Sequence, residues 1–142
     1  MKAILLSIKP EWAEKIYKGE KTIEWRKSRP KLDRNNRHTR VYLYETAPVR
    51  RITGYFILCG CYELDLSAEP VNMADALMAV DVQRRGRVPH DDLVRYQGKS
   101  RCIYAWSVNQ RRDVIRYNVP YRLDDFGLKR PPQSWQYVED PA

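Results

Sequence analysis

The stretch that decides the fold is Gly19-Glu20-Lys21-Thr22-Ile23-Glu24-Trp25-Arg26. Its β-branched and aromatic residues favour an extended chain, so residues 21–26 are expected to form a strand. Gly19 is the expected stop of a preceding helix, because glycine readily adopts the conformation that ends helices. Alternation along a strand places Glu24 and Arg26 on one face and Lys21 on the other. A strand start is rarely regular, so Lys21 can still turn toward Glu24.

On the N-terminal side, residues 3–8 are apolar and β-prone, which indicates a buried strand. Lys9-Pro10 then starts a helix expected over residues 10–18, because proline suits the first helical turn. The apolar residues of this segment recur on one helical face. The opening of the chain is therefore predicted to be strand, helix, strand.

On the C-terminal side, strands are expected at 41–45, 54–66, 102–108 and 114–119. Gly60 is expected to mark a bulge or bend. Residues 67–97 are expected to be mainly helical, with one amphipathic stripe formed by Met73, Ala74, Leu77 and Met78 and with a second short helix that ends at Gly98. The predicted fold class is α+β: a mixed, mostly antiparallel β-barrel of about five or six strands with two or three flanking helices.

The composition favours one basic domain spanning residues 1–142. Lys and Arg number 26 against 18 Asp and Glu, a net charge of +8, so a polyanion is a natural partner. Three cysteines without a framework spacing argue against a disulfide scaffold. No signal peptide or membrane-length apolar run is seen, so a cytoplasmic protein without a membrane partner is expected. The sequence does not determine the oligomeric state, and a monomer is favoured.

Basic residues concentrate in two segments that are too polar to be core. Residues 21–40 contain eight of them: Lys21, Arg26, Lys27, Arg29, Lys31, Arg34, Arg37 and Arg40. The second segment is Arg84-Arg85-Gly86-Arg87. The basic loop 27–40 and the segment from Arg84 to Arg87 are expected to follow the backbone of a nucleic acid, because exposed Lys and Arg neutralise phosphates.

The motif in residues 19–26, G-x-K-x-x-E-x-R, resembles the signature of ASCH domains. Residues 42–49, Tyr-Leu-Tyr-Glu-Thr-Ala-Pro-Val, and the P-P-Q-S-aromatic tail at 131–135 are similar to further elements of that family, in family order. The resemblance implies a PUA-like β-barrel with a cleft beside the first helix. It also implies RNA binding, although some relatives are ribonucleases or amidohydrolases that act on acylated nucleosides.

The predicted function is binding of RNA or a nucleotide-like ligand in this basic cleft. A cation beside a carboxylate can hold a phosphate and accept from the exocyclic amine of a base. The binding residues are predicted to be Lys9, Lys21, Glu24, Arg26, Lys27 and Arg29. The plain alternative for Lys21 and Glu24 is an internal ion pair, in which case Lys21→Ala would cost stability rather than binding. Lys9 precedes a helix N-terminus that attracts anions, but it could equally be an ordinary solvated lysine.

The alternative function is a metal-independent ribonuclease acting in the same cleft. Its catalytic residues would be Lys21, Glu24, Tyr44 and Ser134, in which a phenol and a hydroxyl beside an amine shuttle protons. Packing inside the barrel is the alternative role of Tyr44, and capping of a turn that of Ser134. Amidohydrolase activity is less expected. The resemblance implies that those relatives need a hydroxyl residue at the position that Glu24 occupies in this sequence. No cofactor is expected, and Cys59, Cys61 and Cys102 with His38 or His90 match no zinc spacing.

Overall fold

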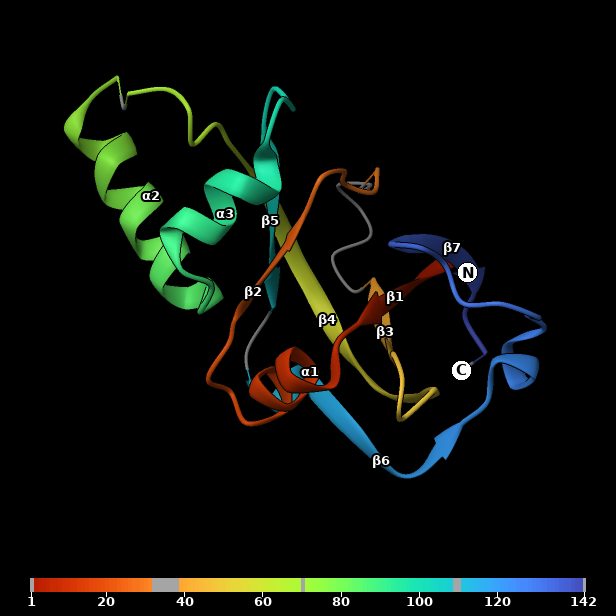
Figure 1. Cartoon of the computed structure of the whole chain (residues 1–142). Helices are drawn as coiled ribbons and strands as arrows, with labels where there is room; N and C mark the ends of the chain where they lie inside the picture. The colour runs from red at the N-terminus through yellow and green to blue at the C-terminus, as the bar shows by residue number, and fades with distance from the viewer. Residues whose placement is uncertain (1, 32–38, 70, 109–110, 142) are drawn as a thin grey trace.

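The computed structural model describes residues 2–31, 39–69, 71–108 and 111–141. The elements follow the order β1 (Lys2–Ile8), α1 (Pro10–Tyr17), β2 (Ile23–Arg26), β3 (Arg40–Glu45), β4 (Arg51–Leu64), α2 (Met73–Gly86), α3 (His90–Gln97), β5 (Ile103–Val108), β6 (Val114–Tyr121) and β7 (Trp135–Glu139) (Figure 1). Short 3₁₀ turns precede β6 and follow it. Within these ranges no helix is long and apolar enough to cross a membrane.

The strands form one sheet along the path β2-β5-β4-β3-β1-β7, with β6 paired to β4. Of the strand pairs in the described residues, β1 and β3 run parallel and the others are antiparallel. The predicted mixed, mostly antiparallel sheet is therefore confirmed. β2 and β7 stand at the two ends of the path and do not pair within the described residues, so closure into the predicted barrel is not shown.

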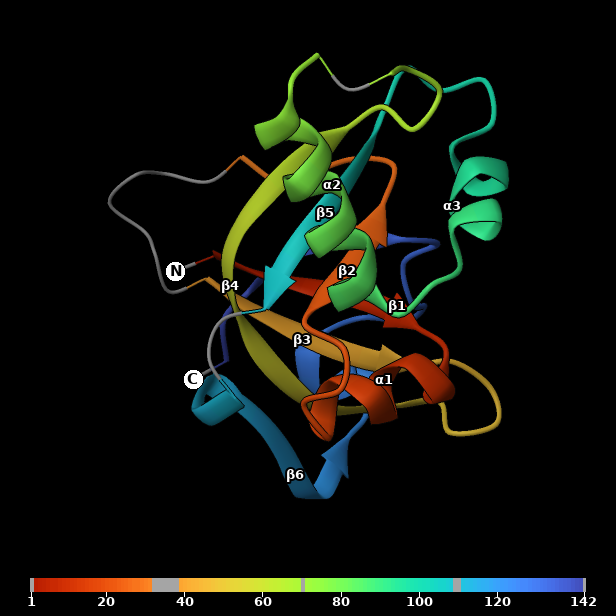
Figure 2. The same ribbon diagram turned by 90° about the vertical axis from the view of Figure 1, so that its left-hand side faces the viewer.

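The long strand β4 bends, so that its first half pairs with β3 and β6 and its second half pairs with β5. Its register with β5 shifts between Leu58 and Gly60, which confirms the bulge predicted at Gly60. A second shift separates the parts of β4 that pair with β6. The two ends of the sheet thus curve toward each other, and β2 comes to lie near the end of β1 (Figure 2).

Alternation along the strands divides the core into three apolar clusters. In β1, Ile4, Leu6 and Ile8 enter a central cluster, which also receives Ala13 and Ile16 from α1. The opposite face of β1 and β3 packs a second cluster that includes Tyr42 and Tyr44. In β2, Ile23 and Trp25 face a third cluster against α2 and α3. Glu24 and Arg26, which alternate with them, are turned to the other face, as the sequence predicts.

The helices begin and end largely where the sequence predicts. Pro10 stands at the start of α1, Gly19 follows its C-cap with φ 78°, and Gly98 caps α3. Figure 2 shows α2 lying across β5 and β2. The amphipathic stripe predicted for α2 is wrong: Met73 and Leu77 are 74% and 63% exposed. The helix instead packs through its C-terminal half, where Val82 and Gly86 are buried.

β7 is a strand that sequence analysis did not predict. Its residues pair antiparallel with β1 over Lys2–Leu6, and Ser7 N–H donates to the Ser134 carbonyl just before the strand begins, 2.9 Å away. The segment follows two prolines and shows little alternation of its own. Its pairing with β1, at the other end of the chain, therefore determines its structure.

Candidate functional site

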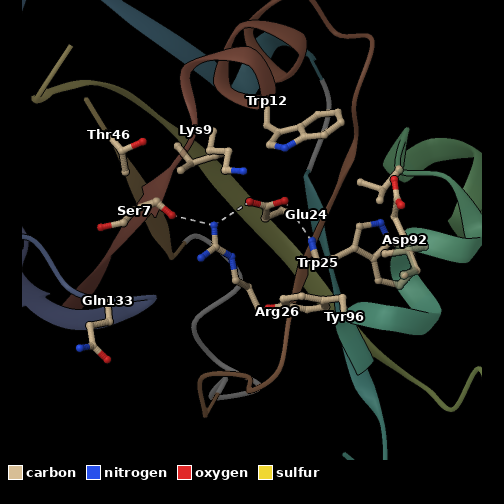
Figure 3. Close-up of a pocket in the computed structure, with 13 residues that line it drawn as sticks. Ser7, Lys9, Trp12, Glu24, Trp25, Arg26, Thr46, Asp92, Tyr96 and Gln133 are labelled. Atoms are coloured by element: carbon tan, nitrogen blue, oxygen red, sulfur yellow. Dashed lines mark hydrogen bonds and ion pairs between the residues drawn. The ribbon is translucent and has the colours of Figure 1, made fainter. Parts of the chain in front are cut away.

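A cavity of about 510 Å³ opens between the end of β1 and the edge of β2 that has no strand partner among the described residues (Figure 3). The first turn of α1 and the helix α3 form its other walls. Glu24 and Arg26 reach it from β2, Lys9 and Trp12 from α1, and Tyr96 from α3. A cleft beside the first helix is where the family resemblance implies one.

Arg26 bridges the two strands that fail to pair at this point. Its Nη2 atom donates to the Ser7 carbonyl of β1 at 2.7 Å and to Glu24 Oε2 at 2.8 Å. Its Nη1 atom donates to Ser134 Oγ at 3.2 Å. Side-chain hydrogen bonds therefore replace strand pairing across the gap, and they fix the carboxylate of Glu24 at the floor of the cavity.

Glu24 is only 6% exposed, and donors approach both of its oxygens. Oε1 accepts from the Trp25 backbone N–H at 3.0 Å and lies 3.5 Å from Lys21 Nζ. Burial alone would raise the pKa of Glu24, but the charges of Arg26 and Lys21 outweigh burial and hold that pKa below its usual value. The floor of the cavity is therefore an ionised carboxylate between two cations.

Lys21 lies behind this carboxylate and is fully buried. Its Nζ atom donates to the Gly86 carbonyl at the C-terminus of α2, 2.5 Å away, and lies 5.3 Å from the centre of the Trp12 ring. Burial lowers the pKa of Lys21, while Glu24 acts in the opposite direction. Lys21 thus joins α2 to Glu24 and is not among the residues that line the cavity.

The C-terminal end of α2 is fastened to the start of β2 by further contacts. Thr22 N–H donates to the Arg85 carbonyl, and the Arg85 side chain donates to Thr22 Oγ1 and Ser107 Oγ. Arg87 Nε donates to the Glu20 carbonyl. These two arginines, predicted to follow a nucleic acid backbone, therefore have protein partners.

The rim of the cavity carries the groups that remain available to a ligand. Lys9 is exposed and makes no side-chain hydrogen bond or ion pair within the described residues. Trp12 and Tyr96 are partly exposed aromatic side chains on different walls (Figure 3). Trp25 forms part of the apolar wall, and its indole packs so closely on Gly86 that a Cβ there would lie 2.2 Å from Nε1.

The structure brings three of the predicted site residues together in the cavity lining: Lys9, Glu24 and Arg26. Lys27 lies at the rim, with its Nζ atom 5.1 Å from the centre of the Tyr96 ring. Lys21 and Ser134 contact these residues from outside the lining. Tyr44 belongs to the cluster on the far side of β3, which is the packing alternative, and Arg29 lines a different hollow.

Sequence reasoning missed the contribution of α3. Leu93 and Tyr96 were expected only as part of a short helix, yet both line the cavity, together with Asp92. Trp12, which belongs to the predicted apolar face of the first helix, packs against the central cluster and also borders the opening. The sequence signal that could have found them is the spacing of Leu93 and Tyr96. Residues three positions apart on a helix lie on the same face.

Among the described residues, no three His, Cys, Asp or Glu side chains gather closely enough to hold a metal ion. His38, one of the histidines considered for zinc, lies outside the described residues, as do Arg34 and Arg37 of the basic segment. Cys59 is exposed, and the other two cysteines are half-buried and free.

These features define an α+β domain that holds a charged, aromatic-lined cavity where two edges of its sheet approach without pairing. The ASCH domain family model matches residues 6–114, and the chain belongs to that family.

Solved structures of the same class resemble the whole chain. The crystal structure of ASCH from Zymomonas mobilis is 21% identical, with a TM-score of 0.74 over 96% of this chain and 87% of that one. Its tyrosine-to-phenylalanine variant, also 21% identical, has a TM-score of 0.74 over 98% and 91% of the two chains. A serine-to-alanine variant gives 0.73 over 96% and 88%, at the same identity. At this identity the likeness concerns the fold. No curated protein matches the chain significantly.

Proposed function

We propose that the chain binds RNA or a nucleotide-like ligand, with a base seated in the cavity at the edge of β2. The observation that carries the proposal is the ionised Glu24 carboxylate at the floor of a cavity of about 510 Å³. Cavities of this size hold small ligands, and a few fixed polar groups among apolar walls determine which ligand fits.

Glu24 has capacity left for a ligand. A carboxylate offers about four lone-pair directions. The Trp25 backbone N–H, Lys21 and Arg26 occupy three of them. An exocyclic amine of adenine or cytosine is a suitable donor for the remaining direction, because carboxylates accept from such amines. Arg26 and Lys21 keep the acceptor ionised and in place.

Trp12, Tyr96 and Lys9 suit the rest of a nucleotide. Aromatic side chains at the mouth offer faces for base stacking, which contributes about 1–3 kcal/mol per base where it has been measured by alanine substitution. Lys9 has no protein partner among the described residues and can reach a phosphate. The first turn of α1, which begins next to Lys9, adds the favourable field of a helix N-terminus.

Paired ligands test the role of Glu24. Cytidine monophosphate and adenosine monophosphate should bind about tenfold more tightly than uridine and inosine monophosphate, since a hydrogen bond to a charged group contributes about 1.5–3 kcal/mol. Isothermal titration calorimetry measures the four affinities. Equal affinities within each pair would contradict the role of Glu24, and no binding of any nucleotide or RNA would overturn the proposal.

Lys9→Ala is the variant least expected to disturb folding. It should weaken phosphate-bearing ligands severalfold without changing affinity for the corresponding nucleoside. Lys99→Ala is the matched control, because Lys99 is an exposed lysine on the turn between α3 and β5. Equal losses in the two variants would mean that only net charge is being measured.

Metal-independent cleavage of RNA in the same cavity is the alternative activity. Of its four predicted catalytic residues, Glu24 lines the cavity, whereas Lys21, Tyr44 and Ser134 are not among the described lining residues, and Lys21 is fully buried. These placements favour binding over catalysis. Incubation of labelled RNA with the protein in EDTA distinguishes the two: binding alone leaves the RNA intact, whereas cleavage that is lost in Glu24→Gln would support the enzyme.

A further inference from the structure

The segment that leaves β2, residues 27–31, starts at the cavity and runs away from it. We call the exposed side chains of Lys27, Arg29 and Lys31 the basic strip. Lys27 is adjacent to Arg26, which lines the cavity, and its Nζ atom lies over the ring of Tyr96. The basic strip is therefore continuous with the rim of the proposed binding site.

Two tryptophans fasten this segment to the sheet. Trp106 Nε1 donates to the Ser28 carbonyl at 3.0 Å, and Trp135 Nε1 donates to Ser28 Oγ at 2.8 Å. Pro30 is buried, and the Lys31 backbone N–H donates to the Tyr137 hydroxyl at 2.8 Å. The backbone of the strip is thus held in place, so a ligand would not have to order it.

The cations of the basic strip have no carboxylate partner among the described residues. Some exposed lysines elsewhere do have one: Lys2 pairs with Glu139, and Lys18 with Glu14. The three cations are exposed, and none of them forms an ion pair with a carboxylate of the described residues. Such an arrangement leaves positive charge available to an external anion.

Aromatic rings accompany these cations. The Arg29 guanidinium lies 5.5 Å from the centre of the Tyr104 ring, and Tyr104 is the β5 residue directly opposite Arg26. Tyr137, beside Lys31, is 46% exposed. Arg29 and Lys31 also border a second hollow of about 500 Å³. Alternating cations and aromatic faces are what single-stranded nucleic acid binds without regard to sequence.

We infer that the ligand of the cavity is a single-stranded polynucleotide, with one base in the cavity and its continuing backbone along Lys27, Arg29 and Lys31. This inference rests on the proposed function, because the cavity supplies the anchor. Beyond the rim residue Lys27, the strip adds phosphate contacts through Arg29 and Lys31, which line a different hollow from the cavity.

A length series tests the inference. Fluorescence or calorimetric titration with adenosine monophosphate and with oligoadenylates of two, four and eight nucleotides should show affinity rising at least about tenfold with length, from added phosphate contacts and stacking. The same lengths of oligodeoxyadenylate show whether the 2′-hydroxyl contributes. Affinity that does not rise with length would overturn the inference and leave the proposed function standing.

The double variant Arg29→Ala/Lys31→Ala locates the added affinity. Octamer binding should fall about tenfold and its salt slope by about 1.4, because each phosphate contact to a single strand contributes about 0.7 to that slope. Binding of adenosine monophosphate should change less than twofold. Lys99→Ala/Arg101→Ala removes the same net charge from an exposed turn and should leave octamer affinity within about twofold.

The outcomes separate the two proposals. If the two double variants lost octamer affinity equally, the basic strip would not be the binding surface for the added nucleotides. Octamer binding that depends on the strip, with no measurable binding of any mononucleotide and no effect of Glu24→Gln, would overturn the cavity as the anchor and with it this form of the inference. No binding of any ligand would overturn both.

Discussion

The cations at the floor of the cavity and those of the basic strip differ in what their charges meet. Lys21 and Arg26 share the carboxylate of Glu24, and they also donate to the Gly86 and Ser7 carbonyls and to the Ser134 hydroxyl. Lys27, Arg29 and Lys31 meet aromatic rings and solvent. The same residue types thus serve the fold in one place and remain available to a ligand in the other, which charge counted along the sequence does not distinguish.

Replacement of Glu24 should have the largest effect. Glu24→Ala leaves Lys21 buried without its counter-charge and removes one acceptor of Arg26, and breaking a buried pair typically costs about 3–5 kcal/mol. Chemical denaturation measures the free energy of unfolding. Glu63→Ala, an exposed glutamate of β4, is the control and should change that free energy by less than about 0.5 kcal/mol. If Glu24→Ala and Glu63→Ala lowered the free energy of unfolding by similar amounts, the stabilising role assigned to the cavity floor would be wrong.

Replacement of Lys21 should have an intermediate effect, on stability rather than on binding. Lys21→Met keeps most of the apolar volume but leaves the buried Gly86 carbonyl without its donor, at a cost of about 1–3 kcal/mol. Ligand affinity should change only a few fold, because Lys21 does not line the cavity and Arg26 still holds Glu24. A large loss of affinity without loss of stability would place Lys21 in contact with the ligand.

How much of this the sequence could predict depends on how local each feature is. Alternation along the strand correctly placed Glu24 and Arg26 on one face, where the two side chains meet. The burial of Lys21 could not be predicted, because it depends on the end of α2, whose Gly86 carbonyl is 65 residues away. β7 was missed for the same reason, since its partner β1 lies at the other end of the chain.

For α2 the sequence predicted a buried face that the structure does not have. Met73 and Leu77 have the spacing of a packed face, yet both are exposed, and the buried residues of α2, Val82 and Gly86, lie in its C-terminal half. Periodicity describes what a helix could bury, and the arrangement of the neighbouring strands determines what it does bury. Tyr44 was similarly ambiguous, because strand parity does not say which face of β3 borders the cavity.

Acid should remove the contribution that Glu24, at the floor of the cavity, makes to the stability of the fold. The pKa of Glu24 is lowered in the folded chain, so its contribution to stability is present above the unfolded value of about 4.3 and is lost as pH falls through the lower folded value. The stability difference between the natural chain and Glu24→Gln should therefore shrink below about pH 4. Denaturation curves at several pH values measure it, and a difference that grows in acid would contradict the assignment.

The basic strip should show the smallest effect on stability. Lys31→Ala and Lys27→Ala each remove an exposed charge that has no acidic partner in the described chain, so the free energy of unfolding should change by less than about 0.5 kcal/mol. Thermal denaturation measures the change. A loss of more than about 2 kcal/mol would mean that the strip belongs to the fold.

The most direct test follows the four indole N–H signals in a nitrogen–proton NMR titration with adenosine monophosphate. Trp12 and Trp25 line the cavity, whereas Trp106 and Trp135 donate to Ser28 below the basic strip. Binding in the cavity predicts saturable shifts of the Trp12 and Trp25 signals, with those of Trp106 and Trp135 moving only when an oligoadenylate is added. Shifts confined to Trp106 and Trp135, or no saturable shift of Trp12 and Trp25 with any nucleotide, would contradict a base in the cavity.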